Sequence, residues 1–131
     1  MIITLCGSTK FKDEFLEVQK QLTLQGHIVL SVGLFAHADG IELSREEKVC
    51  LDNLHKEKIN MSDAIFVINK GGYIGESTYS EIDWANRMKK QIYFLEEIPG
   101  ATDTKASKNP DVQPVVNSEE DAAEWNRLKN I

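Results

Sequence analysis

The stretch DAIFVINKGGYIGESTYSEIDWA, residues 63–85, determines how the rest of the chain is interpreted. It opens with an unbroken run from Ala64 to Ile68, which is rich in β-branched and aromatic residues and typical of a strand buried on both faces of a parallel sheet. Three glycines follow, and Ser77 or Thr78 is then expected to cap a helix. A strand, a glycine loop and a helix start in this order place backbone N–H groups at the carboxyl edge of a sheet, where α/β proteins bind anionic ligands.

The helix after the glycine loop carries an acidic residue on the face that we expect to point toward the sheet. At 100° per residue, one stripe of this helix contains Ser77, Thr78, Glu81, Ala85 and Met88. Glu81 is therefore predicted to project into a cleft above the loop. It is either a structural partner of a lysine or a backbone N–H, or a functional group. We favour the functional interpretation because cleft carboxylates with perturbing neighbours are often catalytic.

The order of the remaining patterns predicts the fold class. Strands are predicted at 2–6, 27–32, 64–68 and 91–95, and helices at 10–24, 44–61, 77–88 and from 118 onward. This alternation indicates a small doubly wound α/β domain with a mostly parallel, flavodoxin- or Rossmann-like sheet of four to five strands flanked by helices. Right-handed crossovers favour the strand order 2-1-3-4.

A second glycine turn, Gly7-Ser8-Thr9, follows the first predicted strand. In a doubly wound sheet it lies beside the turn of the central unit. It has neither the three glycines of the dinucleotide fingerprint nor the glycine frame of a Walker loop. It is either an ordinary strand-to-helix connection or a ligand contact.

Two polar residues fall on the apolar stripe of the helix predicted at 44–61. The apolar members of this stripe are Leu51, Leu54 and Ile59. His55 and Lys58 lie in the same arc and are expected to point inward. Either His55 is a satisfied core histidine and Lys58 extends to solvent, or both residues line a pocket. His37 is expected to be a solvated loop residue, because no other histidine or cysteine lies at metal-ligand spacing.

The composition restricts the classes of partner. A chain of 131 residues is long enough for one domain with a core, and its formal charge of −6 argues against nucleic acid or an anionic membrane as a partner. No apolar run approaches the roughly 20 residues of a membrane span. Met1 leads directly into a predicted strand, so we expect no signal peptide. Cys6 and Cys50 suggest neither a disulfide framework nor a metal cluster, and we expect a cytoplasmic protein without a cofactor.

The segment 99–131 is less regular than the rest of the chain. Residues 101–116 are polar and irregular, and Ser118 then caps a short predicted helix that carries Trp125 and Leu128. We expect the whole chain to form a single domain, with this segment reaching toward a neighbouring subunit in a homodimer or larger homo-oligomer.

The run from Gly72 to Thr78, with Glu81 and Ala85 after it, resembles the signature of the nucleoside 2-deoxyribosyltransferase-like superfamily. Three shorter matches strengthen this resemblance, namely Gly7-Ser8, His55 with Lys58, and Ser62-Asp63. In that family, the glutamate at the position of Glu81 attacks C1′ of a deoxyribonucleoside, and a second base or water then takes the sugar. The resemblance implies the same fold, a small nucleoside or nucleotide as the ligand, and Glu81 as the nucleophile.

We also predict a set of substrate contacts, in part from the chemistry of the residues themselves. These are Gly7, Ser8, Lys58, Asp63, Gly72, Gly75, Ser77 and Thr78. The Ser77 and Thr78 hydroxyls would hold a 5′-hydroxyl or 5′-phosphate, and His55 would protonate the leaving base because histidine titrates near neutral pH. Three positions depart from the family pattern: Cys6 stands about where the family has a tyrosine, Gly75 where its transferases have an aspartate, and His55 about where they have another acid.

Two functional hypotheses follow from these observations. The first is an enzyme that cleaves or transfers at the N-glycosidic bond of a (deoxy)nucleoside or nucleoside 5′-monophosphate, through a glutamate that traps an oxocarbenium-like state. The alternative is a catalytically inactive binding or sensor module for nucleotides or nucleotide sugars with the same fold.

Overall fold

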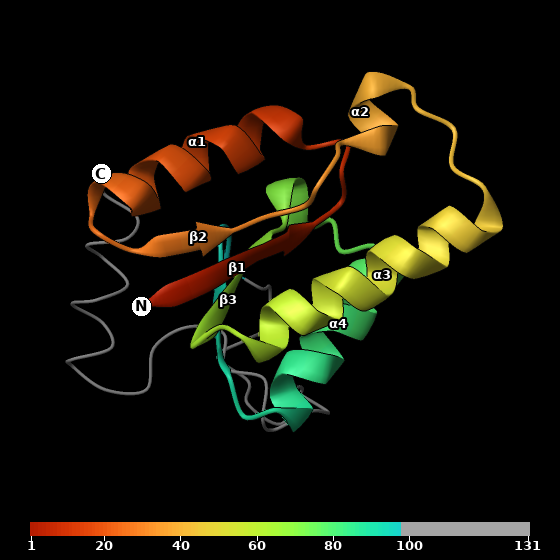
Figure 1. Cartoon of the computed structure of the whole chain (residues 1–131). Coiled ribbons are helices and arrows are strands. Elements are labelled where there is room, and N and C mark those ends of the chain that lie inside the picture. Colours follow the sequence, from red (N-terminus) through yellow and green to blue (C-terminus); the bar gives the residue numbers. More distant parts are fainter. Residues whose placement is uncertain (98–131) are drawn as a thin grey trace.

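The structure is a computed structural model, and it describes residues 1–97 of the chain. Within these residues, four strands form one parallel sheet in the order β2-β1-β3-β4, and helices cover both of its faces (Figure 1). The elements are β1 (Ile2–Gly7), α1 (Lys12–Leu24), β2 (Ile28–Leu30), α2 (Ala36–Asp39), α3 (Arg45–Asn60), β3 (Ala64–Ile68), the short 3-10 helix η1 (Lys70–Gly72), α4 (Glu76–Arg87) and β4 (Gln91–Phe94). The predicted α/β class and the strand order 2-1-3-4 are confirmed.

The two faces of the sheet have separate cores. The core beside α1 contains Ile3, Leu5, Phe15, Val18, Leu22, Ala64, Phe66, Ile68 and Tyr93. The core beside α3 and α4 contains Cys6, Ile59, Ile65, Val67, Ile82, Ala85, Ile92 and Phe94. Successive residues of β1 and β3 alternate between the two cores, as the pleat of a strand requires. Every residue of β3 is buried, which agrees with its unbroken apolar run.

The segment between α1 and α3 differs from the prediction. β2 has three residues instead of the predicted 27–32, because this edge strand pairs with β1 through only three residues. The predicted loop at 33–40 contains the one-turn helix α2, which Gly40 ends in the left-handed conformation. His37 lies on α2 and is exposed, as predicted, and its backbone N–H donates a hydrogen bond to Thr9 Oγ1 at 3.1 Å.

The faces of α3 differ in part from the prediction, although its boundaries are close to it. Ser44 caps α3 through a capping box with Glu47. Leu54, predicted to be in the core, is 50% exposed, because α3 lies on the sheet through His55 and Ile59.

The start of α4 also requires a correction. Gly75 is the N-cap of α4, so the predicted capping by Ser77 or Thr78 is wrong. The extended backbone of Gly75 lets its carbonyl accept the first helical hydrogen bond, from the Tyr79 N–H at 2.9 Å. Met88 is 41% exposed, and the buried face of α4 instead contains Thr78, Ile82, Ala85 and Asn86.

The predictions for the segment 99–131 fall outside the described residues. They concern the single domain extending to the end of the chain, the cap at Ser118, the helix with Trp125 and Leu128, and the contact with a neighbouring subunit. All of them stay predictions. In the part of the chain that the structure describes, no helix has the length and apolar character needed to cross a membrane.

Gly7 is required by the close approach of two strand ends, and Gly7→Ala is expected to destabilise the protein. A Cβ at this position would lie 2.8 Å from the Ile68 carbonyl oxygen and 3.0 Å from Ile68 Cβ, with φ at +152°. We expect the free energy of unfolding, measured by urea denaturation, to fall by about 1–3 kcal/mol. Gly33→Ala is the control, because nothing lies within 4 Å of its Cβ position. Equal losses in both variants would contradict the steric argument.

Candidate active site

Cys6 and His55 meet between β1 and α3. Cys6 is the penultimate residue of β1 and faces the core beside α3 and α4. His55 and Ile59 are four residues apart and form the buried face of α3. His55 Nε2 lies 3.4 Å from Cys6 Sγ, within hydrogen-bond distance for sulfur, and both side chains are buried.

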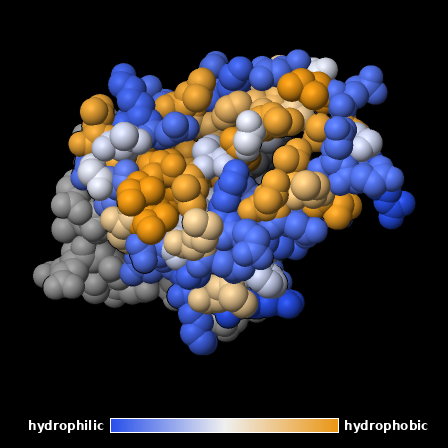
Figure 2. All heavy atoms as spheres, viewed as in Figure 1, coloured by the Kyte–Doolittle hydropathy of each residue, from blue (hydrophilic) through white to orange (hydrophobic). Residues whose placement is uncertain are grey.

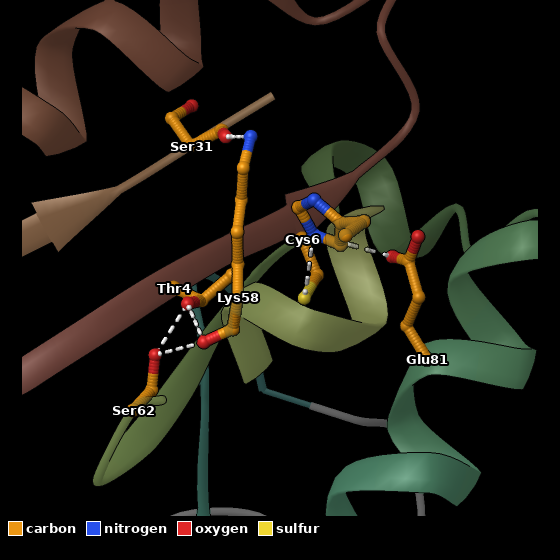
Figure 3. A network of polar contacts seen from close by, with 7 residues as sticks. Thr4, Cys6, Ser31, Lys58, Ser62 and Glu81 are labelled. Atoms are coloured by element: carbon orange, nitrogen blue, oxygen red, sulfur yellow. Dashed lines mark hydrogen bonds and ion pairs between the residues drawn. The ribbon is translucent and has the colours of Figure 1, made fainter. Parts of the chain in front are cut away.

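A hydrogen-bond network fixes α3 against β1 one helical turn from His55. Thr4, which shares its face of β1 with Cys6, donates a hydrogen bond to the Lys58 carbonyl oxygen at 3.1 Å. Ser62 Oγ donates to the same carbonyl at 2.8 Å, and the Thr4 and Ser62 hydroxyls are in contact (Figure 3). The last turn of α3 is thereby held against Thr4 of β1, which sets the position of His55.

The Lys58 side chain runs toward β2. Its ammonium donates a hydrogen bond to the Ser31 carbonyl oxygen at 2.6 Å, just beyond the end of β2 (Figure 3). The side chain is half-buried, so Lys58 neither extends freely to solvent nor contacts Glu81. Its positive charge nevertheless helps to lower the pKa of His55.

Glu81 reaches the same place from α4. It lies at the border of the buried face of α4, and its side chain is 12% exposed. The Trp84 indole N–H donates a hydrogen bond to Asn60 Oδ1 at 2.9 Å, which fixes α4 against the last residue of α3. The two helices therefore present His55 and Glu81 to each other.

Cys6, His55 and Glu81 together form the cluster that we identify as the candidate active site, at the carboxyl edge of the sheet. His55 Nε2 lies 3.9 Å from Glu81 Oε1, and the sulfur, nitrogen and oxygen atoms all lie within 4.8 Å of one another. Figure 3 shows the Glu81 carboxylate directed from α4 toward the end of β1 that carries Cys6. The arrangement brings together a carboxyl, an imidazole and a thiol, and their three donor atoms are close enough to share one cation.

Burial keeps this cluster uncharged near neutral pH. Burial, followed by the charge of Asp52, raises the pKa of Glu81 to about 8. Burial, followed by the charge of Lys58, lowers the pKa of His55 to about 4. Burial and the neighbouring Glu81 raise the pKa of the Cys6 thiol well above its usual range. At pH 7 the carboxyl and the thiol are therefore mostly protonated, and the imidazole is neutral.

Four of the residues predicted to contact substrate lie in the two glycine turns at the same edge of the sheet. Gly7 ends β1, and the Ser8 hydroxyl accepts a hydrogen bond from a backbone N–H of its own turn at 3.3 Å. Gly72 ends η1 with φ at +82°, a conformation that favours glycine. Gly75 begins α4. The structure therefore brings both predicted turns to the edge that carries the cluster.

The other predicted contacts are divided between two places. The Thr78 side chain is buried in the core, whereas Ser77 is exposed, so only the Ser77 hydroxyl faces solvent at the start of α4. Asp63 lies at the opposite, amino edge of the sheet. Its Oδ2 accepts a hydrogen bond from the Ile2 N–H at 2.8 Å, which joins the starts of β1 and β3. Asp63 therefore makes a structural contact at a place remote from the cluster.

Sequence reasoning did not single out three residues at this edge as site residues. The sequence predicts Cys6 on a buried strand but does not place it beside His55, although alternation along β1 indicates the face on which it lies. Lys10 and Tyr73 connect the two glycine turns, with the Lys10 ammonium 3.7 Å from the centroid of the Tyr73 ring. Phe11 packs edge-to-face against Tyr73, with the ring centroids 6.0 Å apart. No local pattern links residues so far apart in the chain.

The described residues form hollows at the surface. The space-filling view shows a hollow between α2 and α3, with hydrophobic and hydrophilic side chains both present around it (Figure 2). A separate groove of about 490 Å³ is lined by residues of α3 and α4, namely Cys50, Asn53, Leu54, Lys56, Glu57 and Trp84. None of the residues predicted to bind substrate lines this groove.

No protein-family model matches the chain, and no curated protein matches its sequence. Solved structures do resemble it. The CMP N-glycosidase BcmB of Clostridium botulinum is 19% identical, with a TM-score of 0.58, and the match covers 98% of this chain and 99% of that protein. A 2-deoxyribosyltransferase of Bacillus psychrosaccharolyticus is 17% identical, with a TM-score of 0.60, and the match covers 100% of this chain and 92% of that protein.

Both similarities extend over nearly the whole length of each chain. They show that this chain has the nucleoside 2-deoxyribosyltransferase-like fold, as the sequence resemblance predicted. Both neighbours are enzymes that act on nucleosides or nucleotides. At 17–19% identity, the similarity demonstrates the fold alone.

Glu81→Gln is expected to stabilise the protein, and to do so more at pH 8 than at pH 5. The folded pKa of about 8 lies above the unfolded value of roughly 4.3, so the stability of the wild type falls as the pH rises through this window. The variant lacks this loss, so its free energy of unfolding should gain about 3.5 kcal/mol on that of the wild type between pH 5 and pH 8. Chemical denaturation at both pH values measures the difference. Glu57→Gln, an exposed carboxyl on α3, is the control. A gain that does not change with pH would contradict the prediction.

Proposed function

We propose that the protein cleaves or transfers at the N-glycosidic bond of a (deoxy)nucleoside or a nucleoside 5′-monophosphate, with Glu81 as the nucleophile. The observation that carries this proposal is the approach of the buried Glu81 carboxyl to His55 at 3.9 Å. The pair lies at the carboxyl edge of a parallel sheet, where open α/β sheets bind ligands. An N-glycosidase and a deoxyribosyltransferase among the structures with this fold support the same class of reaction.

In the proposed first step, the Glu81 carboxylate attacks C1′ while the bond between C1′ and the base breaks. The electron pair of that bond leaves with the base, which takes up a proton, and the sugar remains as an ester on Glu81. Water or a second base then attacks C1′ and releases the carboxylate. The carboxylate also stabilises the oxocarbenium-like transition states on either side of the ester.

One proton can serve both residues of the pair. The resting cluster holds a protonated Glu81 and a neutral His55, whereas the reaction needs a carboxylate and an acid. Transfer of the Glu81 proton to His55 generates both groups together. The pKa values of about 8 and about 4 oppose this transfer by about 5 kcal/mol. The attraction between the new carboxylate and imidazolium charges offsets about 4 kcal/mol of this cost at an effective dielectric near 20. His55 then protonates the leaving base.

The start of α4 supports a role in binding the 5′ end of the substrate. The first backbone N–H groups of a helix have no intrahelical acceptor, and the exposed Ser77 hydroxyl lies beside those of α4. Glu81 lies about one turn further along the helix, so a sugar with C1′ at Glu81 extends its 5′ substituent toward Ser77. The exposed Glu76 carboxylate weakens the binding of a full dianion, which makes both nucleosides and monophosphates candidate substrates.

Glu81→Gln is expected to abolish base release, because an amide cannot form the glycosyl ester. The assay incubates the full-length protein with a panel of nucleosides and 5′-monophosphates and detects released base by mass spectrometry. We expect the rate for the best substrate to fall on the order of 10³-fold or more. Glu57→Gln is the matched control, since it removes an exposed carboxyl close to His55 in the sequence and should retain the wild-type rate.

Two outcomes contradict the proposal. A folded Glu81→Gln variant with wild-type turnover excludes Glu81 as the nucleophile. If the wild-type protein binds nucleotides in calorimetry but releases no base from any of them, the protein is instead a binding or sensor module.

Ser77→Ala tests the placement of the 5′ end. A nucleoside and its 5′-monophosphate are compared for binding in the wild type and the variant. If the phosphate lies at the start of α4, the variant should bind the monophosphate roughly 10-fold more weakly, because a hydrogen bond to a charged group is lost. Its affinity for the nucleoside should change less. An equal change for both ligands, or no change, would place the phosphate elsewhere.

A further inference from the structure

The cluster of Cys6, His55 and Glu81 offers a thiol sulfur, an imidazole nitrogen and a carboxylate oxygen at one point. This is a set of ligands that Zn²⁺ accepts, and three protein ligands with an open fourth position are typical of zinc sites that remain accessible to small molecules. The cysteine alone would not indicate a metal site. The convergence of three different donors from β1, α3 and α4 does.

The distances within the cluster fit a tetrahedral ion. Zinc bonds of about 2.0–2.3 Å place neighbouring ligand atoms about 3.3–3.8 Å apart. Cys6 Sγ lies 3.4 Å from His55 Nε2, and His55 Nε2 lies 3.9 Å from Glu81 Oε1. The third distance does not exceed 4.8 Å. Glu81 is the least buried of the three, so a movement of its carboxylate by about 1 Å would complete the set.

The charges of the three ligands favour a dication at this point. A thiolate, a carboxylate and a neutral imidazole together carry a charge that Zn²⁺ cancels, so burial no longer opposes the ionised forms of Cys6 and Glu81. Around Glu81, the negative charge of Asp52 is countered by the positive charges of Lys56 and Lys48, so the ligands themselves supply the charge that the ion needs. Lys58 favours the neutral, metal-binding form of His55. A hydrogen bond to a backbone group helps to fix the His55 ring, as is usual for histidines that bind zinc.

We propose that Cys6, His55 and Glu81 bind Zn²⁺, and that the bound ion reversibly inhibits the proposed glycosyl reaction. On binding, the Cys6 and Glu81 protons pass to the solvent, and the ion accepts lone pairs from the sulfur, the carboxylate and His55 Nε2. The carboxylate can then no longer attack C1′, and His55 can no longer carry the proton for the leaving base. The inhibition rests on the proposed function, whereas the binding of Zn²⁺ does not.

Calorimetric titration of the metal-free, full-length protein with zinc chloride tests the site without any turnover. We expect one tight site per chain in the wild type. Cys6→Ala should weaken it on the order of 100-fold, because one of three ligands is lost. Cys50→Ala is the matched control, since this second thiol is exposed on α3 and should not contribute. Co²⁺ provides a second readout, a thiolate-to-metal charge-transfer band that should be present in the wild type and Cys50→Ala and absent from Cys6→Ala.

Circular dichroism checks that each variant is folded. If Cys6→Ala does not fold, Cys6→Ser replaces it, because serine nearly preserves the size of the side chain. Equal zinc affinity in the wild type and the Cys6 variant, or no one-to-one binding at micromolar zinc, overturns the proposed zinc site.

The inhibition has its own test. Loss of base release on adding zinc, with recovery in EDTA, supports the inhibition, and zinc binding without this loss overturns it. If the metal-free protein releases no base, the proposed function fails, while the calorimetric result still decides the zinc site.

Discussion

The structure depends on the alternation of side chains along β1, which, like β3, has a parallel partner on each side. Because Ile3 packs into the core beside α1, Thr4 and Cys6 must face α3 and α4. A shift of one residue would place the Thr4 hydroxyl among apolar side chains and remove Cys6 from the candidate site. Thr4 in turn holds the carbonyl oxygen of Lys58, which fixes α3 at the height where His55 meets Cys6. The geometry of the site is therefore a consequence of the register of β1.

The cluster carries a cost in stability. Glu81 is buried without a lysine or arginine partner among the ion pairs of the described residues, and its only ion-pair neighbour there is the neutral His55. A carboxyl in such a place is more stable in water than in the folded protein. A buried ionisable group that reduces stability is characteristic of functional sites, where activity requires a polarity that packing alone would avoid.

The proposed reaction and the proposed zinc site share one physical requirement. A Glu81 carboxylate becomes favourable only when a positive charge appears beside it, because burial disfavours an isolated anion. During the reaction, this charge is the imidazolium of His55 and then the oxocarbenium-like sugar. In the metal-bound form, it is Zn²⁺. Since both uses need the same lone pairs, the ion and the reacting sugar exclude each other, and the neutral resting state is compatible with either.

The fold class, the strand order and the two glycine turns could be predicted from the amino-acid sequence, because hydrophobic periodicity and turn chemistry act over short distances along the chain. The sequence also indicated Glu81 and His55 one at a time, since each falls near an apolar helical stripe. It did not fix the rotation of the helices about their axes, so Leu54 and Met88 were expected in the core but are largely exposed. The meeting of Cys6, His55 and Glu81 was decided only by tertiary structure, because the strand register and the packing of two helices bring together atoms that no local pattern relates.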